Sequence, residues 1–171
     1  MAKEIYLALG SNLGDRVNSL EEALGHMAKQ VGSLEKVSGI YESESWGFSS
    51  DHSFCNCCVS LHTVLEPLQV LETILQIEKG MGRERSSPRE GGEGYADRII
   101  DIDLLLYGDM QFDHPRLVLP HPAMAKRRFV LLPLNEIAPG LVHPVLGISI
   151  HRMLELCLDP VEVWPYKQHE T

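Results

Sequence analysis

The stretch RIIDIDLLLYG, residues 98–108, has the composition of a buried β-strand, except that Asp101 and Asp103 stand in its middle. Side chains alternate along a strand, so the two carboxylates are predicted to face one side, with Cα atoms roughly 6.5–7 Å apart. The apolar residues predicted to face the other side, toward covering helices, are Ile100, Ile102, Leu104 and Leu106. The pattern therefore predicts one apolar face and one face with paired charges.

Placing two carboxylates at this spacing costs free energy. At an effective dielectric constant near 20 they repel each other by about 2–3 kcal/mol, and partial burial adds a desolvation cost for each ion. A strand whose polar face meets water is one alternative, because antiparallel sheets commonly have such a face. Nearby arginines favour a metal–polyphosphate site instead, since guanidinium groups bind phosphate and carboxylate pairs bind divalent cations. These arginines are Arg83, Arg85, Arg89 and Arg98.

The segments around this strand predict the fold. Periodicity indicates strands at 4–10, 34–44, 54–65 and 98–107, and helices at 15–31 and 67–79. The helix at 67–79 is expected to bury Leu68, Leu71, Ile74 and Leu75. This βαββαβ order is that of a ferredoxin-like α+β sandwich, an antiparallel sheet with helices packed on one face. A turn and a short paired strand are expected after Tyr107. Proline-rich irregular segments should follow from His114, with a closing helix at 148–158.

Composition limits the classes of protein to consider. The chain of 171 residues is expected to form one domain, residues 1–171, and its net charge of −9 argues against generic nucleic-acid binding. Without an apolar run of about 20 residues or a signal-peptide pattern, we expect no membrane association and a cytoplasmic location. Cys55, Cys57 and Cys58 are predicted to be buried strand thiols rather than zinc ligands. The oligomeric state stays open, with a monomer favoured.

Six motifs, in order, resemble those of the 6-hydroxymethyl-7,8-dihydropterin pyrophosphokinase family. They are LALGSNLGDR, FCNCCVSLHT, QIEKGMGRER, RIIDIDLLLYG, LPHPAM and RRFVLLPLNEIAP, spread over about residues 5–144. The resemblance implies transfer of the β,γ-pyrophosphoryl group from Mg²⁺-ATP to the hydroxymethyl oxygen of a pterin, with release of AMP.

The resemblance also implies roles for individual residues on the nucleotide side. Asp101 and Asp103 fall on the family's metal ligands and would hold two Mg²⁺ ions between them. Arg83 and Arg98 fall on the catalytic pair that stabilises charge on the transferred group. The residues that fall on ATP contacts are Glu78, Arg83, Arg85, Arg98, His121 and Arg127.

On the pterin side, Phe54 and Phe129 resemble the two rings that sandwich the flat bicycle. Asn56, on the same predicted strand face as Phe54, offers a donor and an acceptor to the amide edge of the pterin. The other positions that the resemblance assigns to the pterin are Ser43, Glu44, Trp46 and Tyr95.

The loop before the DxD strand departs from the family pattern. Gly94 stands where the family has a basic residue, and Arg89 is a candidate replacement; Tyr95 stands in place of the usual Trp. We expect residues 80–97 to close over ATP as a lid. Two other functions stay open for this chain: a ferredoxin-like RNA-binding or regulatory module, and a metal-dependent phosphohydrolase that uses the same DxD.

Overall fold

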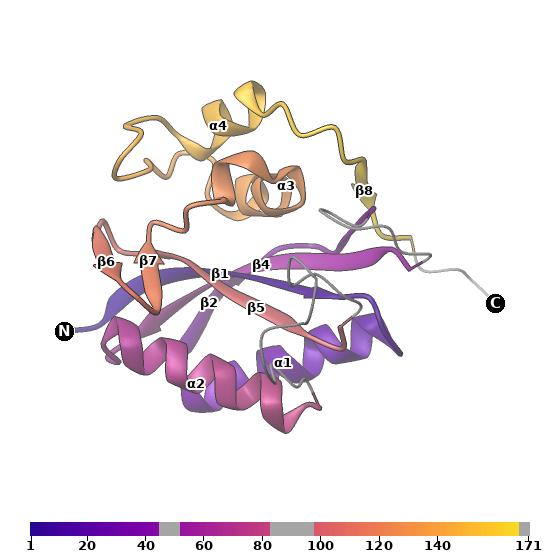
Figure 1. Ribbon diagram of the computed structural model, residues 1–171, viewed down its shortest axis with the longest axis horizontal. Helices are drawn as coiled ribbons and strands as arrows, with labels where there is room; N and C mark the ends of the chain where they lie inside the picture. The colour runs from indigo at the N-terminus through magenta and orange to yellow at the C-terminus, as the bar shows by residue number, and fades with distance from the viewer. Residues whose placement is uncertain (45–51, 83–97, 168–171) are drawn as a thin grey trace.

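The sheet is centred on its two longest strands, β1 and β4, which pair antiparallel from Lys3 opposite Thr63 to Ser11 opposite Cys55 (Figure 1). The computed structural model describes residues 1–44, 52–82 and 98–167. The strand order is β5-β1-β4-β3-β8, with β2 also paired to β4. The strands of this sheet are β1 (Lys3–Ser11), β2 (Ser33–Val37), β3 (Tyr41–Ser43), β4 (Phe54–Thr63), β5 (Asp101–Tyr107) and β8 (Val163–Pro165).

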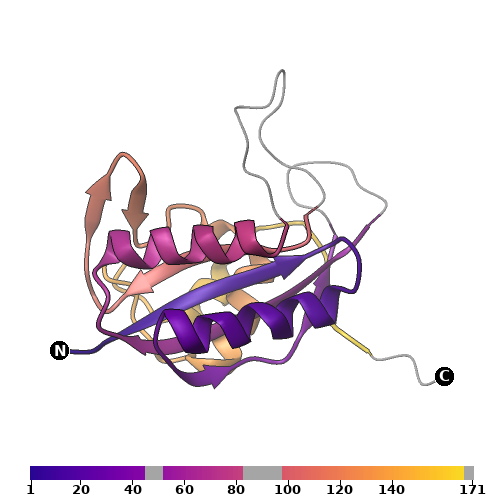
Figure 2. The same cartoon turned by 90° about the horizontal axis from the view of Figure 1, so that it is seen from below.

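Helices α1 (Arg16–Gln30) and α2 (Pro67–Gly80) lie side by side on one face of the sheet (Figure 2). Both begin with local capping: the Asp15 side chain accepts from the Asn18 N–H, and Glu66 forms a capping box with Gln69. The observed order is βαβββαβ, because β2 and β3 together take the place of the second predicted strand, and with the antiparallel sheet it confirms the ferredoxin-like prediction. The predicted apolar stripe of the second helix was partly wrong, because the apolar residues buried there are Pro67, Val70, Ile74 and Ile77, whereas Leu68, Leu71 and Leu75 are half-buried.

The opposite face of the sheet carries α3 (Arg128–Ile137) and α4 (Ile150–Leu156) (Figure 1). Helix α3 was not predicted, because Pro133 lies inside it and a proline normally disfavours a helix interior. A short hairpin of β6 (Phe112–His114) and β7 (Leu117–Leu119) and a 3₁₀ turn (Met124–Lys126) lead from β5 to α3. None of the helices in the described ranges is long and apolar enough to cross a membrane.

Two strand predictions need correction. The segment 34–44 is not one strand, since β2 and β3 are separate and β3 pairs with both β4 and β8. On β5 a register shift against β1 places Leu104 opposite Leu7 and Leu106 opposite Tyr6. Because of this bulge, Leu106 joins Leu105 in the cluster beneath α3 and α4, not the cluster beneath α1 and α2.

Candidate active site

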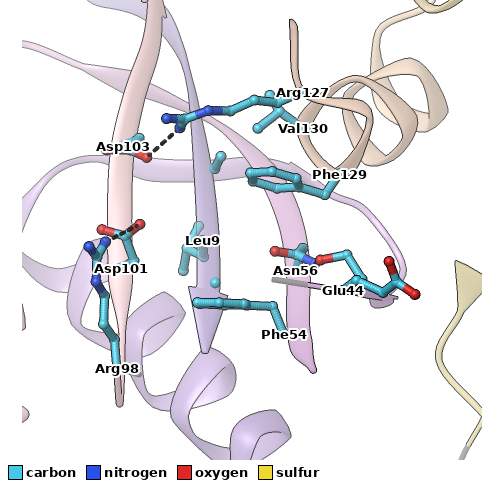
Figure 3. A pocket seen from close by; sticks show the side chains of 13 residues that line it. Leu9, Glu44, Phe54, Asn56, Arg98, Asp101, Asp103, Arg127, Phe129 and Val130 are labelled. Carbon is cyan, nitrogen blue, oxygen red and sulfur yellow. Dashed lines mark hydrogen bonds and ion pairs between the residues drawn. The ribbon is translucent and has the colours of Figure 1, made fainter. Parts of the chain in front are cut away.

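The paired carboxylates lie on the side of β5 that faces α3. Asp101 stands opposite Gly10 and Asp103 opposite Ala8 on β1, so only small residues flank them in the sheet. Both side chains line the same pocket, and they are 23% and 29% exposed. The prediction that they share one face is confirmed (Figure 3). They are neither buried in the core nor simply pointing into bulk water.

Each carboxylate is paired with an arginine (Figure 3). Arg98 Nη1 lies 3.2 Å from Asp101 Oδ2, and Arg127 Nη1 lies 3.9 Å from Asp103 Oδ2. Both arginine side chains are only 12% exposed, so screening by water is reduced and the charges compensate each other. The cost of placing two aspartates together is thus offset by two guanidinium groups that come from different parts of the chain.

Asn12 holds Arg98 in place at the end of β1. Its N–H donates to the Arg98 carbonyl at 3.0 Å, and its side-chain oxygen accepts from the Arg98 N–H. Asn12 is 1% exposed. No role for Asn12 was predicted from the sequence, although it lies in the LGSN motif. Two reciprocal hydrogen bonds of this kind fix the backbone that carries the Arg98 guanidinium.

A flat-sided pocket lies next to the carboxylates, with Phe54 on β4 at one side and Phe129 on α3 at the other (Figure 3). The space between these walls is about 580 Å³ when the open solvent at its mouth is included. Gly10 makes room for this wall, since a Cβ there would lie 3.3 Å from Asn56 Oδ1 and 3.5 Å from Phe54 Cδ1. The two phenylalanines, 75 positions apart in sequence, are therefore brought to one site.

Asn56 can offer fewer hydrogen bonds to a ligand than predicted. Its Nδ2 donates to the Ser43 hydroxyl at 2.9 Å and to the Tyr41 carbonyl at 3.2 Å, so both amide hydrogens are engaged inside the protein. The group left for a ligand is Oδ1, an acceptor. Ser43 and Glu44 also line the pocket, and the Glu44 N–H donates to the Glu162 carbonyl at 3.3 Å.

Glu78 lies on α2 beneath the DxD strand, and it is 1% exposed. Its Oε2 accepts from the Ile102 N–H at 2.8 Å, between the two aspartates in sequence. Since β5 is the edge strand, this bond satisfies a main-chain donor that no strand covers. The structure thus gives Glu78 a role in holding β5, and it does not place Glu78 among the residues that line the two pockets.

A second pocket adjoins the outer edge of β5. Asp103 and His121 line it, together with apolar side chains from α2 and the β6–β7 hairpin. The lining residues from these two elements are Leu71, Ile74, Pro115, Arg116, Leu117 and Val118. Only His121 and Asp103 were predicted from sequence. Asp103 therefore stands where the two pockets meet.

His121 is neutral at ordinary pH. Burial lowers its pKa to about 4, with a further contribution from the nearby Arg127 charge and an opposing one from Asp101. Its Nδ1 accepts from the Ala123 N–H at 3.1 Å, so the hydrogen of the neutral ring is on Nε2. The ring can then donate one hydrogen bond without carrying charge.

This shift makes a testable contribution to acid sensitivity. Between pH 6.5 and 4 the unfolded chain binds a proton at this position that the folded protein resists, so stability falls as pH falls. We expect a loss of about 2 kcal/mol at pH 5 relative to pH 7.5 from this residue. In His121→Asn, which keeps an acceptor near Nδ1, the urea-unfolding free energy should change less over this range. Identical pH dependence in both proteins would contradict the assignment.

Comparison with known proteins identifies the relatives of this chain. A family model described as 7,8-dihydro-6-hydroxymethylpterin-pyrophosphokinase (HPPK) matches residues 6–139. The chain belongs to the HPPK family. A 2-amino-4-hydroxy-6-hydroxymethyldihydropteridine pyrophosphokinase of Porphyromonas gingivalis is 45% identical over 141 residues, covering 82% of this chain and 93% of its own. A pyrophosphokinase of the same name from Synechocystis is 38% identical over 160 residues, 93% of this chain and 78% of its own.

Solved structures support the fold of this HPPK. A crystal structure described as HPPK-DHPS in complex with substrates superposes with a TM-score of 0.73 at 15% identity, covering 91% of this chain and 43% of that chain. A Plasmodium falciparum HPPK-DHPS triple mutant with SDX-DHP gives a TM-score of 0.69 at 21% identity, with 91% and 44% covered. This HPPK thus spans less than half the length of those chains, and the likeness concerns the fold alone.

The family resemblance drawn from six motifs is confirmed, whereas the roles of single residues stay predictions. The structure brings together Arg98, Asp101, Asp103 and Arg127 with Phe54 and Phe129. Most of the expected lid lies outside the described ranges, and so do six residues named from the sequence: Trp46, Arg83, Arg85, Arg89, Gly94 and Tyr95.

Proposed function

We propose that this HPPK transfers the β,γ-pyrophosphoryl group of ATP to the hydroxymethyl oxygen of 6-hydroxymethyl-7,8-dihydropterin. The hydroxyl oxygen attacks the β-phosphorus, the bond from that phosphorus to the α-phosphate oxygen breaks, and AMP leaves while the hydroxyl proton is released. One observation carries the proposal: Asp101 and Asp103 both line an aromatic-sided pocket, and Asp103 also lines a second pocket with apolar walls. That arrangement suits a flat acceptor on one side and a nucleotide on the other.

The aspartate pair suits Mg²⁺. Among the residues that the structure describes, no group of three or more His, Cys, Asp and Glu side chains could hold a metal alone. Two partly exposed carboxylates suit an ion that keeps several water ligands and takes others from phosphate. Asp101 and Asp103 would hold Mg²⁺, which when bound would supply positive charge that neutralises charge on the transferred group. We propose two such ions, held by Asp101 and Asp103.

The remaining residues bind and orient the two substrates. Arg98 and Arg127 would turn from the aspartates to phosphate oxygens once cations occupy the carboxylates. Neutral His121 would donate from Nε2 to a phosphate oxygen. We place the adenine against Leu71, Ile74 and Leu117, and the pterin between Phe54 and Phe129.

No general base is required by this scheme. Phosphoryl-type transfer depends mainly on alignment and charge neutralisation, and the side chains described at this site supply both. Arg83 and Arg85 remain candidates for further contacts to ATP, and Trp46 and Tyr95 for contacts to the pterin. We propose the cytoplasm as the site of action and a monomer as the working form; the four free, buried cysteines are compatible with a reducing compartment.

Product analysis tests this function. Purified protein is incubated with Mg²⁺-ATP, with and without the hydroxymethyl pterin, and the nucleotides are separated by chromatography. We expect AMP in a one-to-one ratio with pterin diphosphate, and only when the pterin is present. Inorganic phosphate formed without pterin would indicate the phosphohydrolase instead, and no turnover would favour the binding module. The module is disfavoured already, because α3 and α4 cover the sheet face that an RNA ligand would need.

Removing one aromatic wall should weaken pterin binding selectively. Phe129→Ala deletes the ring against which the bicycle would stack, and we expect KM for the pterin to rise by about tenfold or more. KM for ATP should stay within about twofold, because the nucleotide pocket does not include this ring. Phe112→Ala, on the β6–β7 hairpin and outside the pocket between Phe54 and Phe129, serves as the control. Equal changes in both Michaelis constants after Phe129→Ala would contradict the stacking role.

A further inference from the structure

One segment near the C-terminus contacts two elements beside the pocket between Phe54 and Phe129, here called the ring pocket: the start of α3, which carries Phe129, and β3, which ends next to Glu44. We call these two sides the α3 wall and the β3 wall. We call residues 157–166 the C-terminal strap; it follows α4, passes the start of α3 and continues through β8 (Figure 1). The family match ends at residue 139, so the strap lies outside it. Its contacts with the two walls are of different kinds.

At the first wall, the strap caps α3. This helix begins with Arg127 and Arg128, which are poorly suited to the positive end of a helix dipole, and Arg127 supplies no side-chain cap. Asp159, 6% exposed, replaces the missing cap: its Oδ2 accepts from the Arg128 N–H at 2.9 Å. An acid far along the chain therefore compensates an unfavourable helix start.

The Arg128 side chain also binds the start of α3 to the strap, in this case by donating hydrogen bonds to strap carbonyls. Its guanidinium donates to the carbonyl of Cys157 at 2.9 Å and to the carbonyl of Asp159. Arg128 is thereby held against the strap, while its neighbours Arg127 and Phe129 line the pocket (Figure 3). The bonds at residue 128 thus hold the backbone at the start of α3, next to Phe129.

At the second wall, the strap pairs with β3. Ser43 stands opposite Val163, and the Glu44 N–H donates to the Glu162 carbonyl at 3.3 Å. The Tyr166 N–H donates to the Ile40 carbonyl at 2.9 Å. Strand β3 has only three residues, and without β8 it would be an edge strand held by β4 alone. Its end carries Ser43 and Glu44, which line the pocket opposite α3.

We propose that Asp159 is a positioning residue for the pterin, and that the C-terminal strap fixes the spacing between the β3 wall and the α3 wall. The proposal rests on the function proposed above. Asp159 lines neither pocket and acts through Arg128 on Phe129, whereas Arg127, assigned to ATP above, is also held by its pair with Asp103, 3.9 Å away. Loss of Asp159 should affect the pterin more than ATP. The strap contacts α3 and β3 beside the ring pocket, whereas α2 and the β6–β7 hairpin line the nucleotide pocket.

Kinetics of Asp159→Ala test the proposal. We expect KM for the pterin to rise by about tenfold, as for the loss of a helix cap that positions a binding side chain, while KM for ATP stays within about twofold. Asp159→Asn should restore most of the pterin affinity, because an asparagine oxygen can accept the same N–H. If Asp159→Ala does not fold, Arg128→Ala, which removes the two bonds to the strap carbonyls, carries the same prediction.

Ser149→Ala is the matched control. It also removes a helix cap in the C-terminal region, since the Ser149 hydroxyl accepts from the Arg152 N–H at the start of α4. It should lower the melting temperature comparably and leave both Michaelis constants unchanged. An unchanged pterin KM in Asp159→Ala, or equal rises for both substrates, would overturn the positioning role. If the wild-type protein itself formed no AMP with pterin, the proposed function would fail instead.

Discussion

Asp101→Asn and Asp103→Asn are each expected to lower the rate of AMP formation by about 10³-fold. The substitution keeps the shape of the side chain and removes the charge that would hold a cation against the phosphates. Each aspartate is partly exposed and pairs with an arginine in the free protein, so the fold should survive the change. Circular dichroism and the melting temperature check the fold, and initial rates at saturating substrates measure the loss.

Asp113→Asn is the control for this pair. Asp113 is an exposed carboxylate on β6 that lines neither pocket, and its substitution should leave the rate unchanged. A second check is the metal dependence, because loss of a carboxylate ligand should raise the Mg²⁺ concentration needed for half-maximal activity. Full activity of either DxD variant would refute the metal assignment.

Arg98→Ala is expected to reduce kcat by about 10³-fold and to weaken ATP binding by less than about tenfold. The guanidinium lies 3.2 Å from Asp101 and is mostly buried, so it is placed where charge on the transferred group would develop. Arg98→Lys should recover only part of the rate, since an ammonium lacks the planar fork of donors. Single-turnover rates and calorimetric ATP binding separate the two effects.

Arg152→Ala is the control for Arg98→Ala, because it also removes an arginine. This residue is 55% exposed on α4, where it lies 3.9 Å from Glu155, and its removal should change neither quantity. If Arg98→Ala lowered ATP affinity as much as it lowered the single-turnover rate, Arg98 would be a binding residue and not a catalytic one.

The period of two in the DxD strand was enough to predict how the carboxylates lie. The same rule placed Phe54 and Asn56 on one face of β4, and both line the pocket. The rule failed at Leu106, because a bulge opposite Tyr6 and Leu7 is a property of the paired strands and leaves no signal in one of them.

The periodicity of the sequence could not predict contacts between residues that lie far apart in the chain. Spacing alone gives no sign that Arg127 reaches Asp103 or that Phe129 reaches the pocket, and only the family resemblance indicated them. Helix α3 was missed because Pro133 argues against a helix locally, whereas packing against β4 and α4 stabilises it. The strap was missed because Asp159 and Arg128 form a pair only after folding.

The most direct test of the central claim is a crystal structure with α,β-methylene-ATP, Mg²⁺ and the hydroxymethyl pterin, since the methylene group blocks cleavage. We predict divalent ions bound to Asp101 and Asp103, the pterin between Phe54 and Phe129, and the adenine at the pocket between α2 and the β6–β7 hairpin. Ions or nucleotide bound away from these two carboxylates would contradict the account.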